Sequence, residues 1–151
     1  MKGGGLAACL GLGVLAGCAP VPGPVLRDGA APFSSQVDVT PARLAGDWVV
    51  RLVSEGGAVA PGQVVRFSAL QPEGPGRFRL GQGAGAALRG RVIWVIWMDG
   101  DSRTVALATA EGDLALIMDR TGAGGADRIR AARDILEWQG FDMALMRGFA
   151  G

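Results

Sequence analysis

Residues 114–142 read LALIMDRTGAGGADRIRAARDILEWQGFD, and two different periodicities follow one another in them. Over residues 114–120, the side chains at every second position, ending with Arg120, share one face, which is typical of a β-strand. Over residues 126–139, the apolar positions recur at helical spacing with Arg and Asp opposite. Gly140 can end such a helix in the left-handed conformation, and residues 141–149 follow as a short apolar segment. The stretch therefore predicts a strand, one amphipathic helix and a closing segment.

Upstream of this stretch, the sequence predicts strands separated by Gly and Pro turns. The expected strands cover residues 47–53, 63–70, 77–80, 88–98 and 103–109. Residues 92–98 are apolar on both faces, so this strand must be covered on both sides. Several antiparallel strands and one late helix predict a mainly β fold: a small antiparallel up-and-down β-barrel with one C-terminal α-helix packed outside. Closing the sheet removes the exposed edges that a meander of this length would present.

The N-terminus has the plan of a secretory signal peptide, because Lys2 precedes a short apolar stretch that ends at Cys18. Residues 15–18, LAGC, resemble the lipobox of bacterial lipoprotein precursors. That resemblance implies that residues 1–17 are removed and that Cys18 carries diacylglycerol. Stable anchoring needs two or more acyl chains, which such a cysteine supplies. Ala19 stands where the inner-membrane retention signal usually has Asp, which implies the outer membrane, with the domain facing the periplasm.

Composition limits the remaining organisation and chemistry. Residues 18–40 are rich in Pro, Gly, Ala and Ser and are expected to form the lipidated cysteine and a flexible tether, while residues 41–151 form one domain. There is no His and no Tyr, and no free thiol after lipidation, so we expect no enzyme, no metal site and no cofactor. With a net charge of +1 and scattered Arg, no nucleic-acid surface is expected.

Two segments resemble the bacterial lipocalins. Residues 44–50, LAGDWVV, contain Gly46 and Trp48 in the Gly-x-Trp motif that opens the first strand of that family. Residues 114–142 match its strand ending in Arg-Thr, its outer helix and its Gly-aromatic-Asp. A middle motif, residues 95–103, is weaker because Ser102 stands where the family has Tyr. The resemblance implies that Arg120 stacks on the Trp48 indole at the closed end of a barrel. Because the chain between them is short for the family, the strands are short or a strand pair is missing.

The resemblance also implies a lipid-binding function in the envelope, for storage or transport. The expected ligand is small and hydrophobic or amphipathic: a fatty acid such as palmitate, or a lysophospholipid. A barrel of this size is either filled by side chains or holds one small ligand. The expected lining residues are Val50, Leu52, Val65, Phe67, Phe78, Leu80, Trp94, Ile96 and Leu116.

Two other functions fit the same sequence. Small periplasmic protease inhibitors also begin with a Leu-Ala-Gly-x-Trp strand, and residues 30–39 would be the inhibitory segment of such a protein-binding barrel. The predicted helix disfavours that alternative, because those inhibitors do not carry one. A structural envelope lipoprotein without a ligand is the other alternative, and the oligomeric state stays open.

Overall fold

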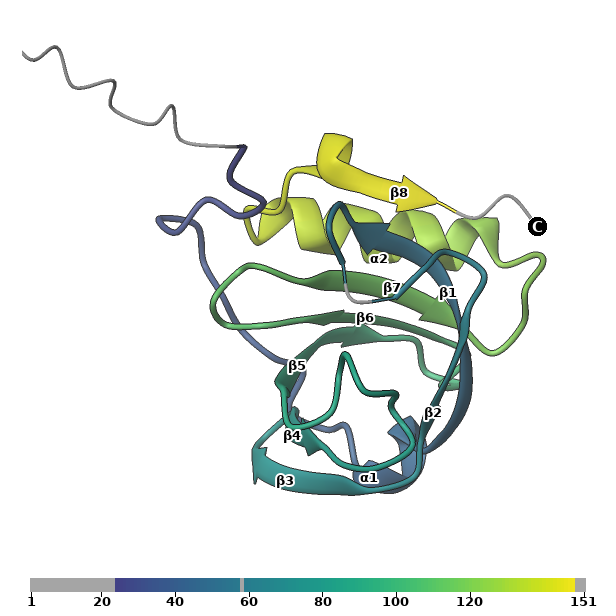
Figure 1. The fold of residues 1–151 in the computed structure, drawn as a ribbon. Helices are drawn as coiled ribbons and strands as arrows, with labels where there is room; N and C mark the ends of the chain where they lie inside the picture. Colours follow the sequence, from purple (N-terminus) through teal and green to yellow (C-terminus); the bar gives the residue numbers. More distant parts are fainter. Residues whose placement is uncertain (1–23, 58, 149–151) are drawn as a thin grey trace, which may run out of the picture.

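The computed structural model describes residues 24–57 and 59–148. The predicted signal peptide, residues 1–17, and the predicted lipidation site, Cys18, lie outside the described residues. Within them, a helical turn and seven strands are followed by one long helix, a short 3-10 helix and an eighth strand (Figure 1). The elements are α1 (Pro41–Leu44), β1 (Gly46–Ser54), β2 (Val64–Phe67), β3 (Leu70–Gly74), β4 (Arg77–Leu80), β5 (Val92–Met98), β6 (Thr104–Ala108), β7 (Ala115–Asp119), α2 (Ala126–Trp138), η1 (Met143–Leu145) and β8 (Met146–Gly148).

All pairings between these strands are antiparallel, in the order β2-β1-β7-β6-β5-β4-β3, and β8 lies along the second half of β1. β2 and β3 stand at the two ends of that order, yet only Ser68 and Ala69 separate them in the chain. The sheet therefore returns on itself into a barrel (Figure 1). The predicted fold class, mainly antiparallel β with one C-terminal helix packed outside, is confirmed.

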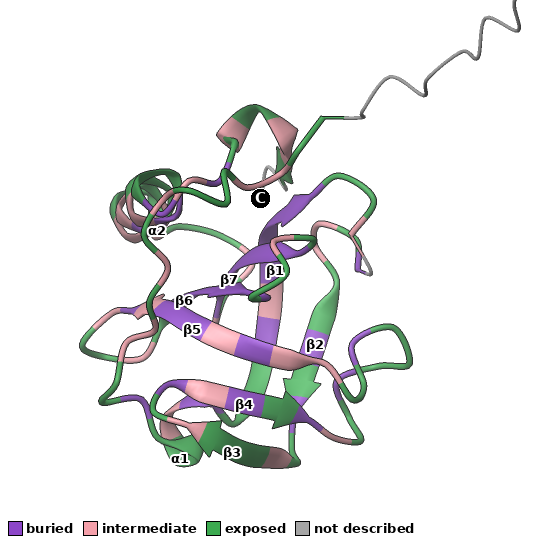
Figure 2. Ribbon diagram, turned by 90° about the vertical axis from the view of Figure 1, so that its left-hand side faces the viewer, coloured by how far each residue is buried: buried purple, intermediate pink, exposed green. Residues whose placement is uncertain are grey.

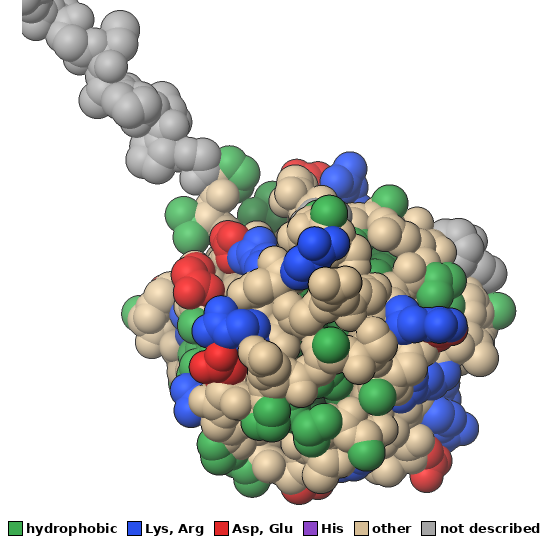
Figure 3. Space-filling model, turned by 60° about the horizontal axis from the view of Figure 1, so that its bottom comes forward, with side chains coloured by type: hydrophobic (Ala, Val, Ile, Leu, Met, Phe, Trp, Pro, Cys, Tyr) green, Lys and Arg blue, Asp and Glu red, His purple; other side chains and the backbone are tan. Residues whose placement is uncertain are grey.

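Side chains from all around the sheet fill the inside of the barrel. Buried and more exposed positions alternate along β2 and β4, whereas β6 and β7 are buried along their whole length (Figure 2). The members of this interior cluster that are at most 3% exposed include Trp48, Val50, Val65, Phe67, Phe78, Leu80, Ile93, Val95, Leu107 and Leu116. Figure 3 turns the end with α1 and β3 toward the viewer and shows no opening into the barrel.

The end of the barrel next to α1 is closed by Trp48 and Arg120. The Arg120 guanidinium carbon lies 3.7 Å from the centroid of the Trp48 ring, the stacking that the sequence resemblance implies. Arg120 also donates hydrogen bonds to the carbonyl oxygens of Ser102, Asp47 and Arg43. Every polar contact of this guanidinium is thus made to the backbone of the closed end, which gives Arg120 a structural role.

Helix α2 lies against the outside of β6, β5 and β7, over a second apolar cluster. The strand residues beneath it are small at Ala106, Ala108 and Ala115, so Ala132 and Leu136 of the helix can approach the sheet closely. The double-sided burial expected of β5 is observed, because Ile93 and Val95 belong to the interior cluster and Ile96 to this outer one. None of the described helices is long and apolar enough to cross a membrane.

Residues 26–39, here called the strap, pack along the outside of the domain. At the C-terminal end of α2, Arg27 donates a hydrogen bond from Nε to the carbonyl oxygen of Gln139 at 3.0 Å and pairs with Phe141 as an isolated bridge. Its guanidinium also lies 4.5 Å from the centroid of the Phe33 ring. The first part of the strap is therefore fixed to the segment that ends α2.

The rest of the strap crosses the outer face of β5. The rings of Phe33 and Trp94 lie 4.8 Å apart, and the backbone N–H of Gln36 donates to the carbonyl oxygen of Val95 at 2.7 Å. Val39 is buried in the interior cluster. The prediction of a flexible tether over residues 18–40 is therefore wrong for the strap. The composition of residues 18–40 does not reveal the hydrogen bonds and ring contacts that the strap makes to distant strands.

Candidate functional site

The barrel interior holds most of the predicted lining residues but leaves them no room for a ligand. Val50, Val65, Phe67, Phe78, Leu80 and Leu116 all belong to the interior cluster. A cavity that could hold an acyl chain would leave accessible area on the side chains around it. Each of these residues is instead at most 3% exposed, so they pack against one another as a core.

Leu52, Trp94 and Ile96, which the sequence analysis places in the barrel, lie in or against the outer cluster beneath α2 and the strap. The prediction is wrong for these three residues because simple alternation does not show which face of β1 or of β5 points into the barrel. β5 is apolar on both faces, so its pattern cannot tell one face from the other. In addition, β1 and β5 each contain an irregular step in their pairing, which shifts the alternation partway along the strand.

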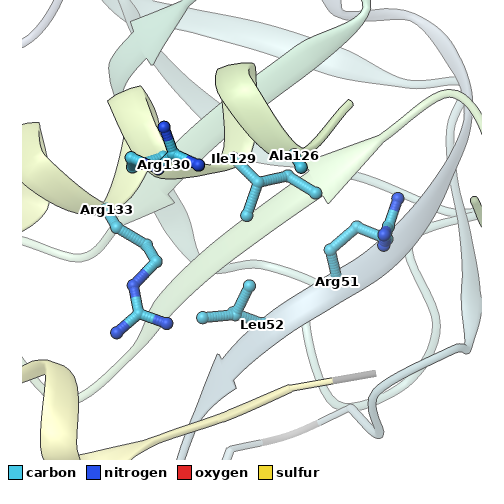
Figure 4. A pocket seen from close by; sticks show the side chains of 6 residues that line it. All are labelled: Arg51, Leu52, Ala126, Ile129, Arg130 and Arg133. Carbon is cyan, nitrogen blue, oxygen red and sulfur yellow. The ribbon is translucent and has the colours of Figure 1, made fainter. Parts of the chain in front are cut away.

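A groove of about 440 Å³ opens on the outer surface between β1 and the first half of α2. Figure 4 shows its lining residues: Arg51 and Leu52 from β1, and Ala126, Ile129, Arg130 and Arg133 from α2. Leu52 and Ile129 supply apolar surface, and the arginines supply charge. Its volume lies in the range of pockets that bind small organic ligands, about 300–1,000 Å³. The groove can therefore hold an extended ligand along the helix.

Arg51 owes its position to the bulge in β1. Val50 and Leu52 lie opposite neighbouring residues of β7, so Arg51 between them is an extra residue, and a bulge of this kind re-aims a side chain. Arg51 is only 7% exposed, and its Nη1 donates to the carbonyl oxygens of Thr121 and Gly124 at 3.4 and 3.0 Å. Its Nε is buried without a hydrogen-bond partner. Buried N–H groups are nearly always paired, so keeping the Arg51 guanidinium in this position costs folding free energy.

The groove has three positive charges and no acidic lining residue. Arg130 and Arg133 are exposed and one turn apart on α2, and in Figure 4 the Arg133 side chain extends toward Leu52. Among the described residues, none of the three lining arginines forms an ion pair with an acidic group. Guanidinium groups bind carboxylate and phosphate through paired hydrogen bonds. Charge and apolar surface together suit an acyl chain with an anionic head.

A second hollow, of about 290 Å³, lies where β4 and β5 approach the turn after β6. Two of its lining residues are also arginines, Arg79 and Arg91. Both are already neutralised, since Arg79 pairs with Glu73 and Arg91 with Asp113, each at 2.6 Å. This hollow is therefore a weaker anion site than the groove.

The N-terminal end of α2, which forms one side of the groove, is held to the barrel by a buried ion pair. Arg128 Nη2 lies 3.0 Å from Asp119 Oδ2, and Asp119 is 1% exposed. Burial alone would raise the pKa of Asp119, but hydrogen bonds from Thr104, Thr121 and Arg128 outweigh it, so the pKa lies below its ordinary value. Asp119 therefore stays ionised and fixes the helix beside β1.

Sequence reasoning missed the groove, although part of its signal was present. Arg51 interrupts an otherwise apolar strand, and Arg130 and Arg133 share a helix face. What the sequence could not supply is that the strand face bearing Arg51 and the start of α2 border the same groove. That depends on the bulge and on where the helix crosses the sheet.

Together, the antiparallel barrel, its Trp–Arg closed end and the outer helix define a lipocalin-like fold. Among solved structures, the solution NMR structure of lipocalin 12 from rat epididymis is similar, with a TM-score of 0.51 over 83% of this chain and 91% of that chain. The two sequences are 12% identical, so the likeness is one of fold alone. No protein-family model and no curated protein matches the sequence.

Proposed function

We propose that this protein is a lipoprotein of the bacterial lipocalin type, anchored through Cys18 in the outer membrane and facing the periplasm. In this proposal it binds a fatty acid or lysophospholipid, without catalysis, for lipid storage or transport in the envelope. The lipocalin-like fold supports the ligand class, since proteins with this architecture enclose or carry small ligands. The binding site, however, is the outer groove and not the filled barrel.

The observation that carries this proposal is Arg51. A guanidinium that is 7% exposed, with an unpartnered Nε, stands at a groove lined by Leu52 and Ile129. The positive charge of Arg51, which pairs with no acidic side chain among the described residues, attracts an anionic head group, while the acyl chain covers the apolar surface. Arg130 and Arg133 add attraction for the head group at the exposed side.

In the protease-inhibitor alternative, the inhibitory segment has to be free to enter a protease, but here it is packed on the domain. Residues 30–39 belong to the strap, in which the N–H of Ser34 donates to Gln139 and that of Gln36 donates to Val95. Insertion of this segment into a protease would require breaking these contacts and exposing Val39, which is 5% exposed. The geometry therefore favours ligand binding over inhibition.

Calorimetric titration with palmitate and lysophosphatidylglycerol, below their aggregation concentrations, tests the proposal. We expect one site per chain and an affinity that rises about two- to fourfold per added methylene until the groove is filled. Arg133→Glu turns one exposed attraction into a repulsion and is expected to weaken binding about fivefold. Arg89→Glu is the matched control, because Arg89 is exposed in the loop before β5 and does not line the groove.

Two results would count against the groove. Equal losses in the Arg133 and Arg89 variants would mean that the charge effect is general and not local. An absence of binding across both lipid classes would favour the structural lipoprotein without a ligand.

A further inference from the structure

The strap leaves the domain at one corner, beside the C-terminal end of α2 (Figure 1). There the N–H of Asp28 donates to the carbonyl oxygen of Gly140 at 2.8 Å, and the N–H of Asp142 donates to that of Leu26 at 2.8 Å. These bonds, together with the Arg27–Gln139 contact, hold the start of the described chain against the residues that follow α2. The chain that leads back to Cys18 therefore starts from a fixed place on the domain.

Apolar side chains are exposed at this corner. Trp138, the last residue of α2, is 67% exposed, and Val25, next to Leu26, is 70% exposed. Both flank the contact between residues 26–28 and 139–142. Burying an exposed indole is favourable, and Trp is enriched in membrane proteins at the level of the lipid head groups.

The length of chain between Cys18 and this corner is short. Seven residues from Cys18 to Val25 span at most about 25 Å when fully extended. If Cys18 carries diacylglycerol, as in the proposed function on which this inference rests, the corner cannot lie farther than that from the bilayer.

We propose that the corner formed by Val25, Leu26 and Trp138 contacts the membrane surface, with the Trp138 indole among the lipid head groups. In this arrangement the strap sets the orientation of the domain relative to the bilayer. Along α2, the groove residues extend from Arg133, about 7.5 Å from Trp138, to Ala126, about 18 Å from it, because a helix rises about 1.5 Å per residue. With α2 standing away from the bilayer at this corner, the start of the groove faces the periplasm and can exchange ligand with it.

Quenching of Trp fluorescence by lipids brominated near the head group tests this orientation. The full-length acylated protein is reconstituted into phosphatidylcholine vesicles, and its acylation is verified by mass spectrometry. We expect quenching in the wild-type protein and loss of most of it in Trp138→Phe, because Trp48 lies inside the barrel and Trp94 and Trp97 are partly buried on β5 against the cluster beneath α2 and the strap. As a control, Val64→Trp is added to Trp138→Phe; Val64 is 58% exposed on β2, away from the corner, and the new indole should not be quenched.

The outcomes separate this inference from the proposed function. Acylated protein whose quenching is unchanged by Trp138→Phe, or is restored by Val64→Trp, would overturn the orientation and leave the anchor and the groove intact. A protein without the diacylglycerol mass would overturn the anchor and with it the orientation. Loss of lipid binding in the groove would leave this result unaffected.

Discussion

Replacing Arg51 by methionine separates binding from stability, because the positive charge of Arg51 attracts an anionic ligand, whereas its contributions to folding oppose one another. In the folded protein, Nη1 makes hydrogen bonds to two carbonyl oxygens, of which the 3.0 Å bond to Gly124 is the shorter. A hydrogen bond from a charged donor contributes about 1.5–3 kcal/mol. The same side chain buries Nε without a partner, which costs about 1–3 kcal/mol. These opposed contributions leave Arg51 nearly neutral for folding.

We therefore expect Arg51→Met to change the free energy of unfolding by no more than about 1 kcal/mol, since methionine keeps the length and apolar contacts of the side chain. Binding of palmitate should fall about tenfold or more, because the most buried guanidinium in the groove is lost. Urea unfolding followed by Trp fluorescence gives the stability, and calorimetric titration gives the affinity. A destabilisation above about 2 kcal/mol with unchanged affinity would refute the reasoning and make Arg51 a structural residue.

Arg120→Met should instead lower the free energy of unfolding by about 2–4 kcal/mol, because it removes the stacking on Trp48 and three hydrogen bonds. Urea unfolding measures this loss, and a loss below about 0.5 kcal/mol would contradict the structural role of Arg120 at the closed end. Asp119→Asn should lower stability by about 2–3 kcal/mol at pH 7. The pKa of Asp119 in the folded protein lies below the unfolded value of about 3.9, so the stabilisation by its carboxylate is present above about pH 4 and is lost as the pH falls through the folded pKa. The difference in unfolding free energy between Asp119→Asn and the wild type should therefore narrow below about pH 4, which acid unfolding curves measure. Phe33→Ala should loosen the strap at its contact with Trp94, raising hydrogen exchange at Gln36 while β7 stays protected; unchanged exchange at Gln36 would mean that the ring contact does not hold the strap.

Regular periodicity predicted the parts of this fold that repeat. The helix expected over residues 126–139 is found as Ala126–Trp138, and the doubly apolar run of β5 is buried on both sides. The alternation of residues 114–120 likewise identified β7 and the side of it that faces the interior. These features depend on local spacing, which the sequence displays directly.

Irregular features of the fold were not predictable from alternation. One extra residue in β1, Arg51, moves Leu52 from the expected interior to the outer face. The spacing of residues in the sequence does not predict where such a bulge occurs. The strap is held by backbone groups such as the N–H of Gln36, which every residue type but proline carries. The groove depends on both the bulge and the crossing of α2, so its residues become neighbours only in the folded chain.

The location of a bound acyl chain tests the central claim most directly. Methyl NMR spectra of the protein with labelled Ile, Leu and Val side chains are recorded with and without palmitate. The account predicts shifts and ligand contacts at Leu52 and Ile129 in the groove, with Leu80 and Leu107 inside the barrel unchanged. Ligand contacts at Leu80 and Leu107, without contacts at Leu52 and Ile129, would show that the barrel opens to hold the ligand and would contradict the claim.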